Sequence, residues 1–288
     1  MSSQRVVAAG SPMIRSRVSS AAHDSPRRRR SDHGSWLESR DVNAPASVAV
    51  DLHCHLLPGV DDGARDLDDA VEMARQAQSD GIAAVCATPH IRHDHAVAIE
   101  ELPERLAELS AAVKAAGCQT QILSGGEVAA TALDELDDDD LTAVALGGST
   151  RWILLEPPPG PLDHRLETAV LALSRRGFRA LVAHPERHLA PDLAERLAGL
   201  VALGALVQVT GAALTDAITR PGMLDLARAR VIHVLGSDSH SPRAGRPMAL
   251  SGAIEALRTV DPLRDHLAWM ASIAPRGIVA GRDVRSPF

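Results

Sequence analysis

Seven short apolar runs, each followed by room for a helix or a connecting loop, occupy the chain from residue 48 to residue 240. The runs are continuous rather than alternating with polar residues, which is typical of parallel strands covered by helices on both faces. Seven such repeats in a row favour a closed sheet over an open one. We therefore predict an α/β fold, a (β/α)7 TIM-like barrel. Its expected strands are residues 48–55, 83–90, 119–127, 151–156, 179–187, 205–210 and 231–240.

The clearest helical pattern lies at residues 68–80. Ala70, Met73, Ala74 and Ala77 recur at positions i, i+3, i+4 and i+7, and Gly81 follows where the helix should end. This spacing predicts one buried helix face against the sheet. Further helices are expected near residues 99–116, 163–176, 192–203 and 216–229, and after residue 240.

Residues 1–46 differ in composition from the rest of the chain. They are rich in Ser, Arg and Pro, contain RRRR at positions 27–30, and hold eight arginines against four acidic residues. A segment of this kind buries too little apolar surface to fold, so we predict a disordered basic extension. Contact of this run with acidic partners or membranes is an alternative, as is an over-long start-site assignment. The folded domain is expected to span residues 47–288, enough for a large core.

Charge and cysteine content exclude several classes of protein. The net charge is −7 although the first 46 residues are basic, so the body of the chain is acidic and a nucleic-acid surface is not expected. No apolar run approaches 18 residues and the N-terminus lacks a signal-peptide pattern, so we predict no membrane insertion. The three cysteines, an odd number, predict a reduced, cytoplasmic protein.

Nearly every predicted strand ends in residues that can bind a metal ion or a phosphate. Barrel enzymes build their sites from this carboxyl-terminal rim, so a series of polar residues there is informative. The residues are His53, His55, His90, Glu127, Glu156, His184, Arg187, Asp238 and His240, joined by Asp62 in the loop after the first strand.

The first strand shows the pattern most clearly. Because side chains alternate across a strand, Asp51, His53 and His55 are expected on one face and Cys54 in the core on the other. Two imidazoles on one face can converge on a cation. Burying charge is costly unless it is paired or bound to metal, and two or three ions would compensate the charges at this rim. The mixture of nitrogen and oxygen ligands suits several divalent metals. The sequence therefore predicts a polynuclear metal site.

Other polar residues are given simpler interpretations. Asp61 is expected to cap a turn, and the acidic run at 137–140 to form a solvated loop. His188 is an alternative candidate for a substrate contact. His93 and His95 are expected in solvent, and the histidines assigned to helix, strand-core or surface positions are His164, His233 and His266.

In combination, DLHCHLLPGVDDGARDL, ATPH, LVAHPER and GSDSH followed by RP resemble the PHP (polymerase and histidinol phosphatase) superfamily. The resemblance is greatest to the manganese-dependent protein-tyrosine phosphatases of the CpsB/CapC/YwqE group and covers residues 48–284. It implies a distorted (β/α)7 barrel, the PHP fold. It also implies a cluster of three metal ions, usually Mn²⁺, with iron and zinc as plausible occupants.

The resemblance also implies a division of the ligands among three ions. The first set is His53, His55, Glu127 and Asp238; the second is Glu127, Glu156 and His184; the third is Asp62, His90 and His240. Arg187 matches a substrate-phosphate arginine, and a second falls at Arg246, with Arg243 competing. The chain departs from the family pattern at Gly126 and Ala129, where Gln and Arg are common.

The activity implied is hydrolysis of phosphotyrosine by attack of a metal-bridging hydroxide, with no cysteine nucleophile. The implied partner is the tail of a bacterial tyrosine kinase in capsule or exopolysaccharide synthesis. Hydrolysis of histidinol phosphate or another small phosphoester is the enzymatic alternative, and a metal-binding regulatory partner of a kinase is the non-enzymatic one. Amidohydrolases with a carboxylated lysine are excluded because the sole lysine, Lys114, lies in a helical pattern.

Overall fold

The structure, a computed structural model, describes residues 48–95, 97–188 and 190–288, so the prediction for residues 1–46 lies outside it. All strand pairings found in this part of the chain are parallel. The strands are β1 (Ala49–Cys54), β2 (Ile82–Ala87), β3 (His90–Ile91), β4 (Gln121–Ser124), β5 (Glu127–Ala129), β6 (Trp152–Glu156), β7 (Arg179–Val182), β8 (Leu206–Thr210) and β9 (Val234–Gly236).

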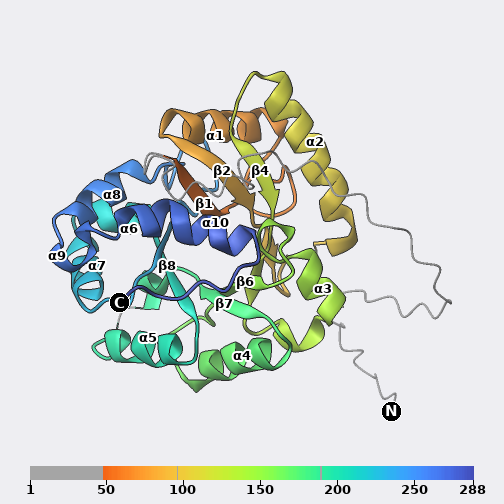
Figure 1. Cartoon of the computed structure of the whole chain (residues 1–288). Helices are drawn as coiled ribbons and strands as arrows, with labels where there is room; N and C mark the ends of the chain where they lie inside the picture. The colour runs from red at the N-terminus through yellow and green to blue at the C-terminus, as the bar shows by residue number, and fades with distance from the viewer. Residues whose placement is uncertain (1–47, 96, 189) are drawn as a thin grey trace, which may run out of the picture.

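The strands form two sheets that curl towards each other. One has the order β1-β2-β4 and the other the order β3-β5-β6-β7-β8-β9. A parallel bridge between Cys54 and Ser239 joins the end of β1 to the segment after β9. The fold is thus the distorted α/β barrel that the sequence predicts (Figure 1).

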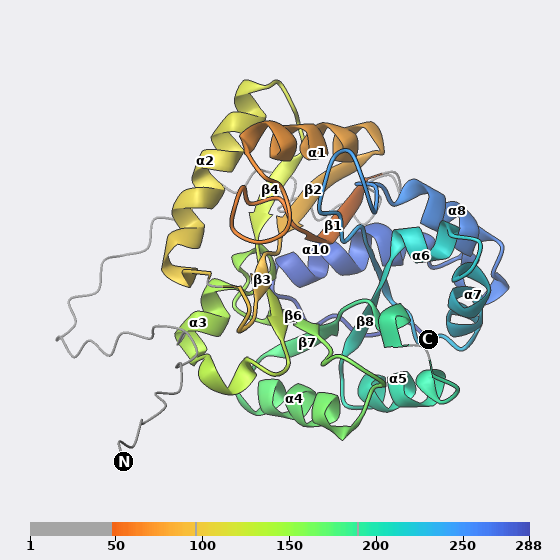
Figure 2. The ribbon, with the colours of Figure 1, turned by 180° about the vertical axis from the view of Figure 1, so that it is seen from behind.

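Helices surround the strands, and Figure 2 shows the ring from the side opposite to α10. The α-helices are α1 (Leu67–Ser79), α2 (Leu102–Ala115), α3 (Asp138–Ala143), α4 (His164–Arg175), α5 (Leu193–Ala202), α6 (Gly211–Thr215), α7 (Arg220–Arg228), α8 (Ser251–Arg258), α9 (Asp261–Arg264) and α10 (Ala274–Val279). Short helical turns are η1 (Ile99–Glu101), η2 (Leu133–Glu135), η3 (Leu146–Gly148), η4 (Pro185–His188) and η5 (Trp269–Ile273). Within the described residues, no helix has the length and apolar character needed to cross a membrane.

Two of the seven predicted strands are broken, and local chemistry explains both breaks. Pro89, which has no N–H to donate, separates β2 from β3. Gly125 and Gly126 separate β4 from β5. A Cβ at Gly126 would lie 2.9 Å from Cβ of Val144, so the backbone passes too closely there for any side chain. These breaks let β3 and β5 leave the first sheet and join the second.

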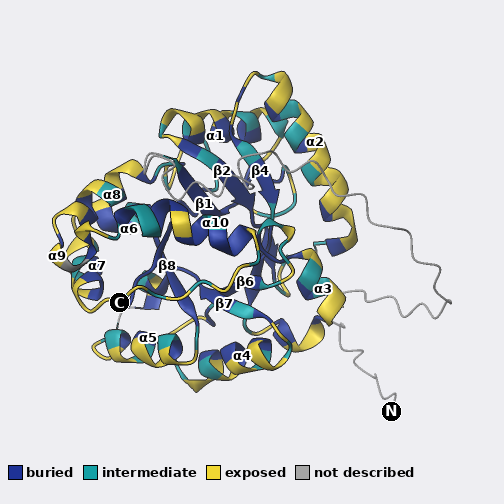
Figure 3. Cartoon of the chain, viewed as in Figure 1, coloured by how far each residue is buried: buried dark blue, intermediate teal, exposed yellow. Residues whose placement is uncertain are grey.

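The core has an inner and an outer layer, and Figure 3 shows the buried strands inside a ring of helices with exposed outer faces. The inner layer lies inside the barrel, where Val50 and Trp152 pack with Ile278 of α10. The outer layer lies between strands and helices and includes Met73 of α1 and Cys54. Because α10 occupies the inner layer, the rim available for a functional site is the one at the opposite ends of the strands.

The simple alternation expected for β1 is wrong. The register with β2 shifts between Asp51 and Cys54, so the strand contains a bulge. Cys54 lies in the core, as expected, but in the outer layer, whereas Leu52 belongs to the inner layer. Asp51 does not share the site of His53 and His55. Its carboxylate instead accepts hydrogen bonds from the backbone N–H groups of His53 and Ser237.

The acidic run at 137–140 is a helix start rather than a loop. Asp137 is the N-cap of α3, and its side chain accepts hydrogen bonds from the backbone N–H groups of Asp139 and Asp140. The Asp140 side chain completes a capping box. Acidic residues are favourable at a helix N-terminus, which the composition of the run alone did not reveal.

Candidate metal centre

The strand ends bring together all nine residues expected to bind metal. They form four overlapping groups in which one potential ligand atom from each residue lies within 4.8 Å of the others. The groups are His55, Asp62, His90 and His240; His53, Glu127 and His184; His53, His55 and Asp238; and His90, Glu127 and Glu156. Segments separated by nearly two hundred residues thus meet at one rim of the barrel.

His53 and His55 are oriented by hydrogen bonds on their outer nitrogens. The Nδ1 atom of His53 lies 3.0 Å from Oε1 of Gln208, and Nδ1 of His55 lies 2.7 Å from Oδ2 of Asp61. Nδ1 of each ring donates to an oxygen, which directs both Nε2 atoms inward. An imidazole held in this way by a carboxylate or an amide is typical of a metal ligand.

Glu127 lies at the centre of the cluster and is fully buried. Its Oε2 is 3.3 Å from Nε2 of His53 and 2.9 Å from Nδ1 of His90, while Oε1 is 2.6 Å from Nε2 of His184. Burial alone would raise the pKa of Glu127, but His53 and the neighbouring imidazoles hold it well below its usual value. The residue is therefore a carboxylate that can bridge two ions.

His53 of β1 and His55 just after it can carry the positive charge that matches the carboxylates of the cluster. Burial alone would lower the pKa of His53, yet the carboxylates of Glu127 and Asp238 raise it. Burial opposes protonation of His55 too, but its contacts with the carboxylates of Asp238, Asp61 and Glu127 raise its pKa well above the usual value. Without a cation, protons on the imidazoles would compensate the carboxylates. Bound cations would take over this role and displace the protons.

Glu156 and His184 belong to different groups, whereas the family resemblance implies one shared ion. Glu156 lies with His90 and Glu127, and His184 lies with His53 and Glu127. His90 also faces two groups, because Nδ1 lies near Glu127 and Nε2 lies 3.4 Å from Oδ1 of Asp62. A neutral imidazole has one acceptor nitrogen, so His90 serves one group at a time.

The backbone is strained at two of these residues. His184 has a φ of 30° and Asp238 a φ of 51°, in a region that residues other than glycine rarely adopt. Such strain persists only where the surrounding structure enforces it, and it is common at functional sites. Here it turns two strand-end side chains towards the cluster.

The buried polar atoms of the site fit a set of metal ions. Oε2 of Glu127, Oδ1 of Asp238, Nδ1 of His90 and Nδ1 of His184 are buried, and none of them makes a well-aligned hydrogen bond in the described structure, although Oε2 of Glu127 and Nδ1 of His90 lie close together. Buried polar atoms are otherwise almost always paired, so partners of another kind are expected. Imidazole nitrogens and carboxylate oxygens together suit divalent manganese, iron or zinc.

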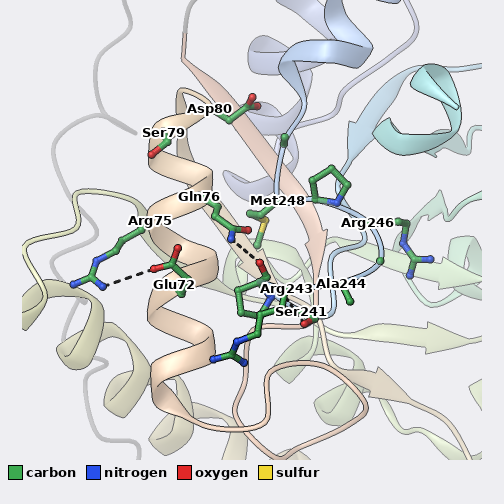
Figure 4. A pocket seen from close by; sticks show the side chains of 14 residues that line it. Glu72, Arg75, Gln76, Ser79, Asp80, Ser241, Arg243, Ala244, Arg246 and Met248 are labelled. Carbon is green, nitrogen blue, oxygen red and sulfur yellow. Dashed lines mark hydrogen bonds and ion pairs between the residues drawn. The ribbon is translucent and has the colours of Figure 1, made fainter.

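Two arginines approach the cluster from outside and meet at Asp238. Arg187 in η4 forms an ion pair with Oδ2 of Asp238, and Nη2 of Arg246 lies 3.2 Å from the same oxygen. Arg243 instead pairs with Asp69 of α1. Figure 4 shows Arg246 pointing away from α1, beside a cavity of about 520 Å³ between this helix and residues 241–249.

Residues that the sequence interpretation missed support the cluster. Asp61 does cap a turn, since it accepts a hydrogen bond from the N–H of Gly63, but it also binds His55. For Gln208 the sequence offers one usable signal, a glutamine within the apolar run ALVQVT. Burial raises the pKa of Asp51 to about 6, so this residue too is an unusual buried acid.

The sequence predicts that His93 and His95 both lie in solvent, and the structure agrees for only one of them. His93 is exposed, as predicted, but His95 is only half-exposed and its ring centroid lies 5.1 Å from that of His90. The loop folds back over the rim, which a local polar sequence cannot show. His188 is buried and Nδ1 contacts the carbonyl oxygen of Gly160, so it has a structural partner.

A parallel α/β barrel with histidines and carboxylates gathered at one rim defines a class of barrel proteins with a metal centre. Within that class, residues 49–260 match the family described as capsular polysaccharide synthesis, CpsB/CapC, and the chain belongs to this family.

Individual relatives agree with this assignment. The chain is 32% identical over 202 residues to tyrosine-protein phosphatase YwqE of Bacillus subtilis, covering 67% of this chain and 77% of YwqE. It is 27% identical over 199 residues to CapC of Staphylococcus aureus, with the same two coverages.

Solved structures extend the comparison to the fold. A chain from the crystal structures of YwqE from Bacillus subtilis and CpsB from Streptococcus pneumoniae, described as metal-dependent tyrosine phosphatases, matches with a TM-score of 0.70 and 26% identity. The match covers 82% of this chain and 96% of that one. A phosphotriesterase homology protein from Escherichia coli matches with a TM-score of 0.54 at 12% identity, over 81% and 99% of the two chains, which shows the shared fold alone.

Proposed function

We propose that this chain is a metal-dependent protein-tyrosine phosphatase. The observation that carries the proposal is the convergence of two arginines on the rim of a nine-residue cluster of potential metal ligands. The ligands are His53, His55, Asp62, His90, Glu127, Glu156, His184, Asp238 and His240, and we assign them to a cluster of three ions, with Mn²⁺ as the resident metal. When bound, divalent ions neutralise a phosphate dianion and lower the pKa of water, which supplies the nucleophile.

The arginines act on the substrate phosphate. Arg187 and Arg246 are each about one third exposed, so their guanidinium groups can reach a ligand in solvent. A cation held by Asp238 would weaken the attraction of this carboxylate for both guanidinium groups. They can then bind phosphate oxygens through paired hydrogen bonds and stabilise the charge of the transition state.

The leaving group requires little help from the protein. The tyrosine hydroxyl has a pKa near 10, so the departing phenolate needs less protonation than an alkoxide. This difference makes phosphotyrosine easier to hydrolyse than phosphoserine. The names of the relatives support the same substrate class.

A cysteine nucleophile is not part of the proposal. Burial raises the pKa of the Cys86 thiol well above its usual value, and Cys86 lies inside the barrel. Burial also raises the pKa of Cys54 well above its usual value. Neither thiol can form the thiolate that a phosphocysteine mechanism needs.

We place the protein in the cytoplasm, with the phosphorylated tail of a bacterial tyrosine kinase in capsule or exopolysaccharide synthesis as its substrate. The family description supports the pathway. All three cysteines are buried and free of disulfides, as a reducing compartment requires.

A substrate panel with defined metals tests the proposal. Metal-free protein is reconstituted with Mn²⁺, Fe²⁺ or Zn²⁺ and assayed on a phosphotyrosine peptide, the matching phosphoserine peptide and histidinol phosphate. We expect the highest kcat/KM for phosphotyrosine with Mn²⁺. Turnover that survives complete removal of metal, or a preference for histidinol phosphate, would reject it.

A further inference from the structure

Arg92 lies beside the metal centre although no part of the proposed mechanism uses it. It directly follows β3, whose residues His90 and Ile91 pair with Glu127 and Val128 of β5. The next residue of β5, Ala129, pairs with Glu156 of β6. Arg92, Ala129 and Glu156 therefore follow one another across three neighbouring strands.

The small side chain of Ala129 leaves room for the arginine to cross the middle strand. Nη1 of Arg92 lies 3.4 Å from Oε1 of Glu156, a residue two strands away. Ala129 is 7% exposed, so it is largely covered. A longer side chain at position 129 would occupy the path of the guanidinium group.

The contact divides the two oxygens of Glu156 between different neighbours. Oε1 faces Arg92, whereas Oε2 lies 4.0 Å from Nδ1 of His90, towards the group that also contains Glu127. Arg92 is the only hydrogen-bond donor found for this carboxylate among the described residues. One oxygen is thus held outward and the other is directed into the cluster.

The loop holds Arg92 in this orientation. Nη2 lies 3.2 Å from Nε2 of His95, and Nε lies 2.7 Å from Oδ1 of Asp94. The arginine side chain is 28% exposed, so it is neither buried nor free in solvent. A guanidinium group fixed on three sides can fix a carboxylate in turn.

We infer that Arg92 is a positioning residue that orients Glu156 as a metal ligand, as Asp61 and Gln208 orient His55 and His53. The inference rests on the proposed metal centre. Residues that hold a ligand from outside typically change metal affinity or activity by about 10–100-fold when they are replaced. Arg92 would act on the ion bound by Glu156 and leave the ions held by the other groups in place.

Metal binding of the whole chain tests this role. The variants are Arg92→Gln, which removes the charged fork, Arg92→Lys, which keeps only the charge, and Ala129→Leu, which keeps Arg92 but blocks its path. Arg105→Gln on α2 is the matched control, because Arg105 is an exposed arginine paired with Glu101. Each metal-free protein is titrated calorimetrically with Mn²⁺, and its folding is checked by circular dichroism.

We expect the affinity of one bound ion to fall about 10–100-fold in Arg92→Gln and Ala129→Leu, less in Arg92→Lys, and not in Arg105→Gln. Wild-type affinity in folded Arg92→Gln would overturn the inference. A raised KM for a phosphotyrosine peptide with unchanged metal binding would also overturn it, because Arg92 would then be a substrate contact. A wild-type chain that binds Mn²⁺ but hydrolyses no phosphotyrosine would instead refute the proposed function and leave this comparison intact.

Discussion

The Nε2 atoms of His53 and His55 lie 3.3 Å apart while the Nδ1 atom of each ring contacts an oxygen on its far side. Two inward lone pairs at this distance repel each other unless a proton or a metal ion lies between them. Nearby carboxylates raise the pKa of both rings and so favour positive charge at this point. The pair is therefore preorganised for a cation.

Asp61→Asn and Gln208→Ala are expected to weaken metal binding although neither residue faces the cluster. Asp61→Asn removes the negative charge that holds the Nδ1 proton of His55, and Gln208→Ala removes the acceptor for the Nδ1 proton of His53. The cost of each change is about 10–100-fold in Mn²⁺ affinity. Calorimetric titration of metal-free protein measures it. Asp225→Asn, an exposed residue of α7, is the control and should bind as the wild type does. Unchanged affinity in both site variants would show that Asp61 and Gln208 only stabilise the fold.

The sequence predicts the barrel because continuous apolar strands and helical spacing are local signals. The sequence also predicts that the strand-end residues lie close together, because the carboxyl ends of parallel strands meet at one rim. The bulge in β1 and the path of the 92–95 loop depend on contacts between distant segments. For this reason the neighbourhoods of Asp51 and His95 could not be derived from local pattern.

Partners of a ligand are harder to predict than the ligand itself. The sequence predicts a turn residue at Asp61 because its hydrogen bond to the Gly63 N–H is local. Its hydrogen bond to His55 depends on the fold of the loop. The resemblance favours Arg246 as the second phosphate arginine, with Arg243 competing. Only the fold shows that Arg246 reaches Asp238 whereas Arg243 pairs with α1.

Arg187→Gln and Arg246→Gln are expected to lower kcat/KM for a phosphotyrosine peptide by about 10²–10³-fold, the usual cost of losing a transition-state charge contact. Arg243→Gln should change it little, because Arg243 pairs with Asp69 of α1. Steady-state kinetics on the three variants, each checked for full metal content, measures the difference. If Arg243→Gln is the more damaging change, the second phosphate arginine has been misplaced.

Cys86→Ser is expected to retain activity, while chelation should abolish it. The thiol lies inside the barrel and burial raises its pKa well above the usual value, so it carries no charge at neutral pH. Turnover of the variant with Mn²⁺, before and after treatment with EDTA, tests both statements. A folded variant that has lost all turnover at full metal occupancy would point to a role for this cysteine.

His233 is expected to make stability depend on pH. It is fully buried, accepts a hydrogen bond from the N–H of Val207, and lies against the rings of Trp269 and Phe288. Burial lowers its pKa from 6.5 to about 4. Between pH 4 and pH 6.5 the unfolded chain binds a proton at this ring that the folded chain does not. The contribution of the neutral ring to the free energy of unfolding is therefore complete above pH 6.5 and is lost as the pH falls towards 4.

Between pH 7 and pH 5, His233 alone lowers the free energy of unfolding by about 2 kcal/mol. Urea unfolding of metal-free wild type and of His233→Leu at both pH values isolates it, because the site histidines titrate equally in the two proteins. The variant starts from a lower stability, since Val207 loses its acceptor, but should lose less on acidification. Equal losses in the two proteins would mean that His233 becomes protonated in the folded state without cost, which its buried ring and its neighbours Trp269 and Phe288 argue against.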